Sequence, residues 1–570
     1  MANKKQSGEN EKSISSFHDA DILEEVLQHV GDFGRYQKLL IMATMPLGFT
    51  FAYVYFVQMF ITVTPENYWC RIPELANLSV ELRRNLSAPG ALTGQWDHCQ
   101  TFDTNWTKVL ETLTPPTGRD PLVPCQHGWE FELSDIPYHT VTTEREWVCD
   151  RASYIPFAQS VFFVGSVTGT FTFGLLADRF GRVPAVIATN LIGGVSGVAT
   201  IFTSGLWDFV FCRFLAGLTY DNCFMILYII ILEFVGSQYR TWVANLILAF
   251  SFAIAGITLP WMALYIADWR MLMWVTSAPM FIVILAPWFL PESVRWLVSR
   301  GRGNEAVTIL KRIERINRTK IPDEIMDEFI VFSNRDEVED RQSIFSMLRS
   351  TKLRNTMIKL IIVFMGCGCV FDGVMRLSNS FGLSFFAVFS VNEVSEFMAI
   401  VAVAVLLDRF GRRTSTCGPA LICSTLLFIA SFVRDGLPRA GLAIAARLFS
   451  IISYTGAMQW CTEIIPTPFR ASGVSILHMS AYLANVFSPF IVFSDRIWSK
   501  LPLVIFNTAA FITTAVFMTL PETKGLPMPQ TRADGEKIIR EHSLFSIRRK
   551  DTENSENNAE IRKLYEENVL

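Results

Sequence analysis

Long apolar runs alternate with polar segments along most of the chain. Twelve of these runs are long enough to cross a bilayer, because about 20 helical residues span its hydrocarbon core. They lie at 36–64, 154–177, 184–204, 207–233, 241–266, 271–290, 356–379, 382–407, 416–434, 440–463, 471–494 and 501–520. The pattern predicts an all-α membrane protein with twelve transmembrane helices.

Composition supports this class. The chain of 570 residues is 51% hydrophobic and only 18% charged, with a mean hydropathy of +0.31. Soluble domains carry about 25% charged residues. A net charge of -3 gives no basic surplus for a nucleic-acid partner. Residues 1–35 are polar, so no cleavable signal peptide is expected. The lipid bilayer is the expected surrounding.

The polar segment 65–152 indicates which side faces outward. It carries three Asn-X-Ser/Thr acceptors, at Asn77, Asn85 and Asn105. It also carries four cysteines, Cys70, Cys99, Cys125 and Cys149. Glycosylation and disulfides both belong outside the cytosol. Four cysteines allow three pairings, and the sequence does not choose among them. Arginines fill the short loops on the other side, so both termini are expected in the cytosol.

An internal repeat recurs at one fixed offset. The run Asp178-Arg179-Phe180-Gly181-Arg182 returns 230 positions later as Asp408-Arg409-Phe410-Gly411-Arg412. The same offset relates Glu233 to Glu463 and the pair Pro291-Glu292 to Pro521-Glu522. Three matches at one offset predict two six-helix halves in parallel repeat. This arrangement resembles the major facilitator fold.

The repeat and the polar segments together divide the chain. The expected parts are a cytosolic N-terminal segment (1–35), a first half (36–290) containing the glycosylated loop (65–152), a cytosolic linker with helices (291–355), a second half (356–520) and a cytosolic tail (521–570).

The repeated charges lie where two halves would meet in the cytosol. Pairing across the halves would hold that face shut. A signal for topology alone needs positive charge but no acids at repeated positions. We therefore expect a cytosolic gate. Its residues are Asp178, Arg179, Arg182, Glu233, Arg240, Asp408, Arg409, Arg412, Glu463 and Arg470.

Several motifs, in order along nearly the whole chain, resemble one family. They are Leu23-Glu24-Glu25-Val26 through Gly31-Asp32-Phe33-Gly34-Arg35, Glu146-Trp147-Val148-Cys149, Cys212-Arg213-Phe214-Leu215-Ala216-Gly217, Pro291-Glu292-Ser293-Val294-Arg295-Trp296-Leu297 and Ser488-Pro489-Phe490. The family is that of the organic cation, anion and zwitterion transporters of the solute carriers. The resemblance implies a plasma-membrane protein that moves small organic ions by alternating access, with a site at the midplane. It also leaves a homo-oligomer open, through the large loop.

Charged residues inside the apolar runs are the candidate substrate site. A charge at the bilayer centre costs about 2.5–3.5 kcal/mol on insertion scales, so such residues usually face a cavity. The acids are Asp221, Asp372, Glu393 and Glu396, and Arg213, Arg376 and Arg447 are available to neutralise some of them. Glu396 matches a glutamate of the family's cation carriers. The aromatic candidates for cation–π contact are Phe224, Phe371 and Tyr482.

Two departures from the family bear on the charge of the substrate. Tyr482 stands where the cation carriers have an aspartate and the anion carriers a basic residue. Asp221 stands where cation carriers often have a lysine. Acids are gained and a base is lost, which favours small organic cations such as amines. A zwitterion of the carnitine, ergothioneine or carcinine type and an organic anion exchanger are the alternatives.

No motif indicates catalysis or a cofactor. The chain has no HExxH, no GxSxG, no Cys/His metal cluster and no nucleotide-binding loop. We therefore expect neither an enzyme nor a metal site, and no primary drive by ATP. The membrane potential supplies about 2.3 kcal/mol per charge and 100 mV, or roughly 50-fold accumulation of a monovalent cation. A receptor that binds without transport is the remaining alternative.

Overall fold

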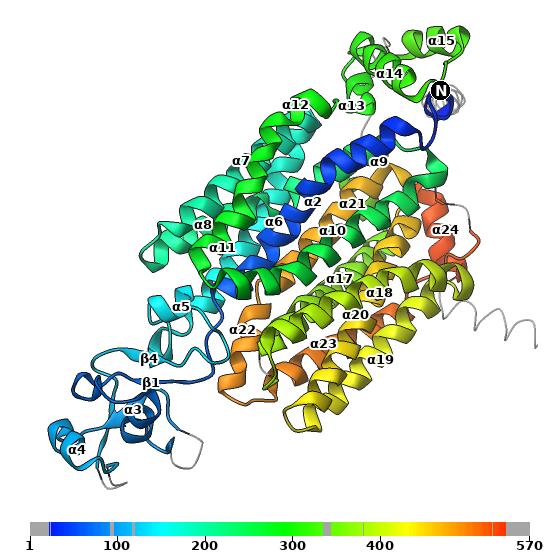
Figure 1. The fold of residues 1–570 in the computed structure, drawn as a ribbon. Helices are drawn as coiled ribbons and strands as arrows, with labels where there is room; N and C mark the ends of the chain where they lie inside the picture. The colour runs from blue at the N-terminus through cyan, green and yellow to red at the C-terminus, as the bar shows by residue number, and fades with distance from the viewer. Residues whose placement is uncertain are drawn as a thin grey trace, which may run out of the picture.

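The computed structural model describes residues 22, 24–91, 96–116, 120–333, 344–379, 381–526, 528–529 and 531–542. Helices dominate these residues and form two bundles side by side (Figure 1). Eleven of the described helices are long and apolar enough to cross a membrane, and α10 contributes a shorter apolar stretch, Phe250–Ile266. Together they account for the twelve predicted apolar segments.

The first half contains the helices from α2 to α12. Their bounds are α2 Arg35–Ile61, α6 Tyr154–Phe180, α7 Arg182–Ile201, α8 Leu206–Tyr220, α9 Asn222–Glu233, α10 Ser237–Ile266, α11 Trp269–Ser277, the 3-10 turn η4 Ala278–Leu285 and α12 Ala286–Phe289. Helices α6 and α8 pack closely because Gly165, Gly169 and Gly217 have no side chains to separate their backbones.

The second half contains the helices from α17 to α23. Their bounds are α17 Thr351–Arg376, α18 Phe385–Phe410, α19 Arg412–Phe432, α20 Leu437–Ile464, α21 Arg470–Asn485, α22 Ser488–Phe493 and α23 Leu501–Met518. A further helix, α24 Arg532–His542, follows and meets the start of α17.

Two predicted helices are interrupted in the structure. The segment predicted at 207–233 is divided into α8 and α9 at Asp221. The segment predicted at 471–494 is divided into α21 and α22 before Pro489, which occupies the first turn of α22 where its missing N–H has no helical partner. The first break places a carboxylate within a membrane-length segment.

The long loop after α2 forms a small folded unit at one end of the bundles (Figure 1). Two antiparallel strand pairs organise it. They are β1 Tyr68–Cys70 with β4 Trp129–Phe131, and β2 Gln100–Phe102 with β3 Leu122–Pro124. Helices α3 Val80–Ser87, α4 Trp106–Thr112 and α5 Val141–Glu144 complete it. The disulfides are Cys70–Cys125 and Cys99–Cys149, which selects one of the three pairings left open above.

The acceptor asparagines of this loop differ in exposure: Asn77 and Asn105 are exposed, and Asn85 is half-buried. Glu144 ties the loop unit to α11. Its carboxylate accepts hydrogen bonds from Trp269 Nε1 at 2.8 Å and from the Arg270 guanidinium at 2.5–2.6 Å. The bond from Arg270 lowers the pKa of Glu144.

Short helices cover the opposite end of the first half, called here the tail side (Figure 1). They are α13 Val294–Ser299, α14 Gly303–Asn317 and α15 Asp323–Ser333, while the short helix α16 Ile344–Leu348 packs against α17 of the second half. Asn317 joins them to the N-terminal segment. Its Nδ2 donates to Val30 O at 2.9 Å, and its Oδ1 accepts from Tyr36 N at 2.7 Å. This asparagine therefore has a structural role, although it begins an Asn-X-Thr triplet.

The two halves meet along two seams. Helix α10 packs against α18, and α6 packs against α21 and α22. On the loop side, phenylalanines of α2 also meet α18: Phe56 lies 5.2 Å from Phe389 between ring centroids, and Phe60 lies 5.0 Å from Phe385. The two halves are therefore in contact on the loop side in this conformation.

Candidate substrate-binding site

Asp221 lies at the break between α8 and α9 and is buried. Its Oδ1 accepts a hydrogen bond from the Tyr482 hydroxyl at 2.7 Å, and its Oδ2 accepts one from the Thr170 hydroxyl at 3.3 Å. Because Tyr482 belongs to α21, the first bond crosses between the halves. In the described part of the chain, no lysine or arginine forms an ion pair with Asp221.

Asp372 lies near the loop-side end of α17 and is fully buried. Arg376, one turn later, donates to it through Nε at 2.7 Å and through Nη2 at 3.1 Å. Both partners also reach the first half. The Tyr55 hydroxyl donates to Asp372 at 2.5 Å, and Arg376 Nη1 donates to Gln159 Oε1 at 2.7 Å. This ion pair therefore joins the halves on the loop side.

Glu393 and Glu396 lie one turn apart on α18 and share one guanidinium. Arg447 Nη2 on α20 lies 3.3 Å from Glu393 Oε1 and 2.9 Å from Glu396 Oε2. Arg447 and Glu393 are 0% exposed, and Glu396 is 7% exposed. Two carboxylates thus face one cation, and only Glu396 has measurable exposure.

The three aromatic candidates have different surroundings. Phe371 lies under Arg447, with 5.1 Å from the guanidinium carbon to the ring centroid. Tyr482 meets Tyr220 edge-on at 6.1 Å. Phe224 stacks on Phe51 at 5.0 Å within the core of the first half. The structure therefore brings Tyr482 to Asp221 and Phe371 to the Glu393–Glu396–Arg447 group, and it places Phe224 among other rings.

Residues 126–533 match the model of a family described as sugar (and other) transporter. The chain belongs to this family. It is a family of transporters, so the chain is a membrane transporter and not an enzyme.

Curated relatives cover nearly the whole chain. Solute carrier family 22 member 3 of Rattus norvegicus is 27% identical over 535 residues, covering 90% of this chain and 96% of the relative. The carcinine transporter of Drosophila melanogaster is 28% identical over 554 residues, with 92% and 81% covered. Solute carrier family 22 member 1 of Bos taurus is 28% identical over 536 residues, with 91% and 93% covered. The predicted resemblance to this group of solute carriers is confirmed.

A solved structure confirms the fold. The proton:xylose symporter XylE of the major facilitator superfamily, bound to 6-bromo-6-deoxy-D-glucose, superimposes with a TM-score of 0.57. The alignment has 16% sequence identity and covers 88% of this chain and 99% of the symporter. The predicted all-α major facilitator fold is therefore correct.

In the first half of this transporter, the predicted gate charges pair locally. Arg182 Nη1 lies 2.6 Å from Asp178 Oδ1, and the backbone amides of Arg182 and Val183 donate to the Glu292 carboxylate at 2.9 and 3.2 Å. Glu233 hydrogen-bonds Ser293. Two further contacts complete this half: Arg240 pairs with Glu24 at 3.5 Å, and Arg179 lies over the ring of Phe180.

In the second half, Arg412 takes a different partner. Its Nη2 lies 2.8 Å from Glu463 Oε1, while the amides of Arg412 and Arg413 donate to Glu522, each at 3.0 Å. Three further contacts lie in this half. The Thr523 hydroxyl donates to Glu463 at 2.5 Å, Arg409 lies over the ring of Phe410, and Arg470 donates to the Thr467 hydroxyl at 3.1 Å. Asp408 is also a predicted gate residue, but its side chain is not among those that the structure describes. These contacts all stay within one half, and the gate remains a prediction.

Sequence reasoning missed four residues of the site: Tyr55 and Tyr220, which are buried, and Tyr454 and His478, which are half-buried. Tyr55 stacks on Tyr220 at 5.2 Å, and Tyr454 stacks on Phe371 at 6.0 Å. A signal existed for His478, because it is the one histidine of seven that lies in a predicted membrane run. Tyrosines are common in such runs, so the other three had no comparable signal.

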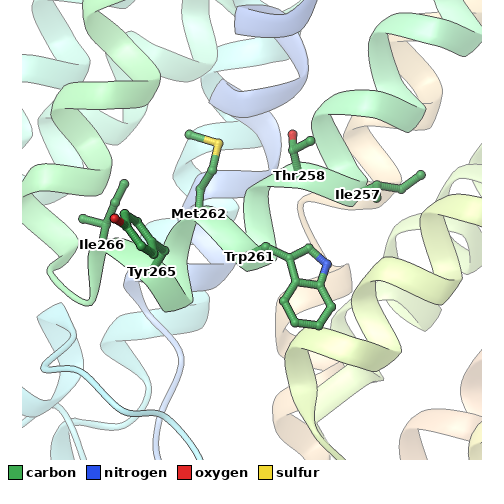
Figure 2. A pocket seen from close by; sticks show the side chains of 6 residues that line it. All are labelled: Ile257, Thr258, Trp261, Met262, Tyr265 and Ile266. Atoms are coloured by element: carbon green, nitrogen blue, oxygen red, sulfur yellow. The ribbon is translucent and has the colours of Figure 1, made fainter.

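A hollow of about 400 Å³ lies elsewhere, on one face of α10. Figure 2 shows its lining, which is Ile257, Thr258, Trp261, Met262, Tyr265 and Ile266. Trp261 and Tyr265 are exposed, and the lining has no charged residue. Exposed aromatic rings near a helix end are typical of a membrane interface. This surface suits lipid contact and lacks the acids that an organic cation requires.

Proposed function

We propose that this transporter carries small organic cations, amines in particular, across the plasma membrane. One observation carries the proposal: the four buried carboxylates of the candidate site have two arginines, Arg376 and Arg447, as ion-pair partners among the described residues. The other two buried arginines, Arg213 and Arg439, bond Thr200 and Asp435 instead. Asp372 has Arg376 as its partner, Glu393 and Glu396 share Arg447, and Asp221 has neutral partners. A buried carboxylate without a cation is costly, so the closed interior favours a cationic guest.

In the proposed mechanism the cargo binds between the halves. Asp221 faces Tyr482 across the seam, and Glu396 is the more exposed member of its pair. Both acids suit an ammonium group, and the rings of Tyr220, Tyr454 and Tyr482 suit its alkyl substituents. Each well-placed ring adds roughly 0.5–2 kcal/mol to the binding of a cation.

Alternating access then requires the halves to rock around the cargo. We propose that residues 36–290 move against residues 356–520. The ion pair of Asp372 and Arg376 would part from Tyr55 and Gln159 as the loop side opens. The charges on the tail side would exchange their partners within each half for partners across the halves, and so latch that side.

The proposed placement in the membrane follows the loop unit. Its two disulfides and its three acceptor asparagines suit an extracellular position, which leaves both termini in the cytosol.

Among the relatives, the carcinine transporter is named for an amine cargo, which supports the same class of cargo here. An anion suits the site less well, because Arg376 and Arg447 already face carboxylates. The third arginine named from the sequence, Arg213, is buried within the first half and donates to the Thr200 hydroxyl at 2.6 Å. Self-association through the loop stays open.

The test is saturable uptake of radiolabelled tetraethylammonium in oocytes that express the chain. The variants Asp221→Asn and Glu396→Gln remove one charge each while keeping the shape of the side chain. We expect each to lower kcat/KM at least tenfold, since a charged contact is worth about 1.5–3 kcal/mol and each 1.4 kcal/mol is a factor of ten.

The control is Glu111→Gln, which removes one charge from the exposed face of α4 in the loop unit. It should leave uptake unchanged at equal surface expression. Absence of tetraethylammonium uptake, with p-aminohippurate or carnitine transported instead, would overturn the cation proposal in favour of an anion or a zwitterion. Specific binding without uptake would indicate a receptor.

A further inference from the structure

The group formed by Glu393, Glu396 and Arg447 has two carboxylates but one guanidinium, and the binding of a cationic cargo alone does not explain this imbalance. Both carboxylates depend on one guanidinium nitrogen, Arg447 Nη2, and its distance to Glu396 is shorter than that to Glu393 (2.9 against 3.3 Å). Arg447 Nη1 is used elsewhere, donating to the backbone oxygen of Asn392 at 2.7 Å. The guanidinium therefore favours Glu396.

Glu393 has an oxygen without a partner. Its Oε2 is buried and accepts no hydrogen bond from the described residues. The carboxylate lies against Gly256 of α10, where a Cβ atom would collide with it. Glu393 thus sits on the seam between the halves, sealed by the backbone of the opposite half, with one oxygen available to carry a hydrogen.

The other elements around this carboxylate supply no second cation. Helix α20 contributes Arg447, α17 contributes the ring of Phe371 against the guanidinium, and α10 contributes Gly256. The neighbouring Asn392 on α18 is neutral. Within the described parts of α19 and of the 3-10 turn Leu377–Asn379, no charged group acts on either glutamate, and only Glu396 and Arg447 act on Glu393.

A net negative charge sealed in the seam would be strongly destabilising, whereas a neutral carboxylic acid would not be. We propose that Glu393 binds a proton in the empty transporter and that the chain exchanges organic cations for protons. This inference rests on the proposed function. It adds a second transported ion and replaces the membrane potential as the main driving force.

The exchange is balanced at each step. In the empty state Glu393 holds its proton on Oε2, and Arg447 pairs with Glu396. The ammonium of the cargo takes Arg447's place at Glu396, and the guanidinium moves to Glu393. The O–H bond of Glu393 then breaks, and its proton leaves with water to the side from which the cargo came. After the cargo departs on the other side, water there returns one proton to Glu393.

The test uses the purified full chain in liposomes with the potential clamped at zero. Tetraethylammonium suits it, because this cation carries no exchangeable proton. With the interior one pH unit more acidic than the exterior, we expect about tenfold accumulation, because one pH unit equals the free energy of a tenfold gradient. The readout for Glu393→Gln is the ratio of uptake with and without the gradient, which should fall to one whatever its absolute rate. Glu111→Gln should keep the ratio of the unmodified chain.

Two measurements separate the failures. Counterflow of labelled against unlabelled tetraethylammonium needs no proton, so its presence without any effect of the gradient would overturn the exchange and leave cation transport standing. Absence of counterflow would overturn both.

The second measurement uses the unmodified chain, so it tests the exchange even if the Glu393→Gln variant does not fold. In weakly buffered detergent, adding tetraethylammonium to the unmodified chain should release about one proton per bound cation, because the cation at Glu396 moves Arg447 to Glu393 and the O–H bond of Glu393 then breaks. Binding without proton release would overturn the exchange.

Discussion

The tail-side ends of the two halves repeat each other closely, but their membrane centres do not. Glu292 and Glu522, 230 positions apart, accept the first two backbone amides of α7 and α19 at distances of 2.9–3.2 Å. At the centre, Arg447 of the second half lies 230 positions after Gly217 of the first. One position holds a buried charge, and the other has no side chain.

The difference follows from what each region must do. A helix N-terminus leaves amides without partners, and a carboxylate satisfies them in either half. The centre of the first half instead uses Gly217 to bring α8 against the backbone of Phe162 in α6. The second half has Glu393, Glu396 and Arg447 there. The repeat therefore persists where backbone geometry sets the residue, and it has diverged where the proposed cargo binds.

The largest effect should come from Arg447→Met. This change leaves the buried Glu396 carboxylate without its cation, and breaking a buried ion pair in this way costs about 3–5 kcal/mol. We expect loss of the monodisperse peak or a large fall in the thermal midpoint, measured by fluorescence-detected size exclusion in detergent. Arg434→Met, at an exposed position after α19, should change neither. A stable Arg447→Met protein would show that Glu396 is protonated as well as Glu393.

The second-largest effect should come from substitutions in the two repeated turns, at Gly181 and Gly411. Gly181 and Gly411 have φ of 109° and 87° with ψ near 165°, a region open essentially to glycine alone, at a cost of about 1–3 kcal/mol for other residues. We expect Gly181→Ala to lower the thermal midpoint more than Gly411→Ala. An added Cβ would lie 2.5 Å from Glu292 Oε2 at the first position, but 3.2 Å from Glu522 Oε2 at the second.

Gly174→Ala is the control for these turns, because a Cβ there meets nothing within 4 Å. It should be neutral or slightly stabilising, since alanine suits a helix interior better than glycine. Equal losses at Gly181 and Gly411 would show that backbone strain alone, and not the contact with the carboxylate, sets the effect.

A smaller effect should distinguish the two repeated arginines. Glu463→Gln removes the charge that faces Arg412, whereas Glu233→Gln leaves Arg182 paired with Asp178. A hydrogen bond to a charged group contributes about 1.5–3 kcal/mol. We therefore expect Glu463→Gln to lower the thermal midpoint more than Glu233→Gln. The reverse order would mean that the pairing differs between the halves in solution.

The sequence predicted the tail side better than the centre. Short motifs at a constant offset encode tight turns, so the repeat was readable at Gly181 and Gly411. Contacts at the centre join residues that are far apart in the chain, such as Tyr55 with Asp372 and Asp221 with Tyr482. Helical periodicity does not report which faces of two distant helices meet. For the same reason the disulfide pairing was open, and the place of Phe224 in the first-half core was not foreseen.

The smallest effect on uptake should come from Tyr482→Phe, which removes the hydrogen bond from the Tyr482 hydroxyl to the Asp221 carboxylate between the halves. A hydrogen bond to a charged group contributes about 1.5–3 kcal/mol to stability. The ring remains, so its contact with Tyr220 and its cation–π capacity are kept. We expect a fall in the thermal midpoint and retained tetraethylammonium uptake, in contrast to Asp221→Asn. If Tyr482→Phe abolished uptake as fully as Asp221→Asn does, the hydroxyl itself would bind the cargo, and the second half would contribute a neutral donor as well as charges to the site.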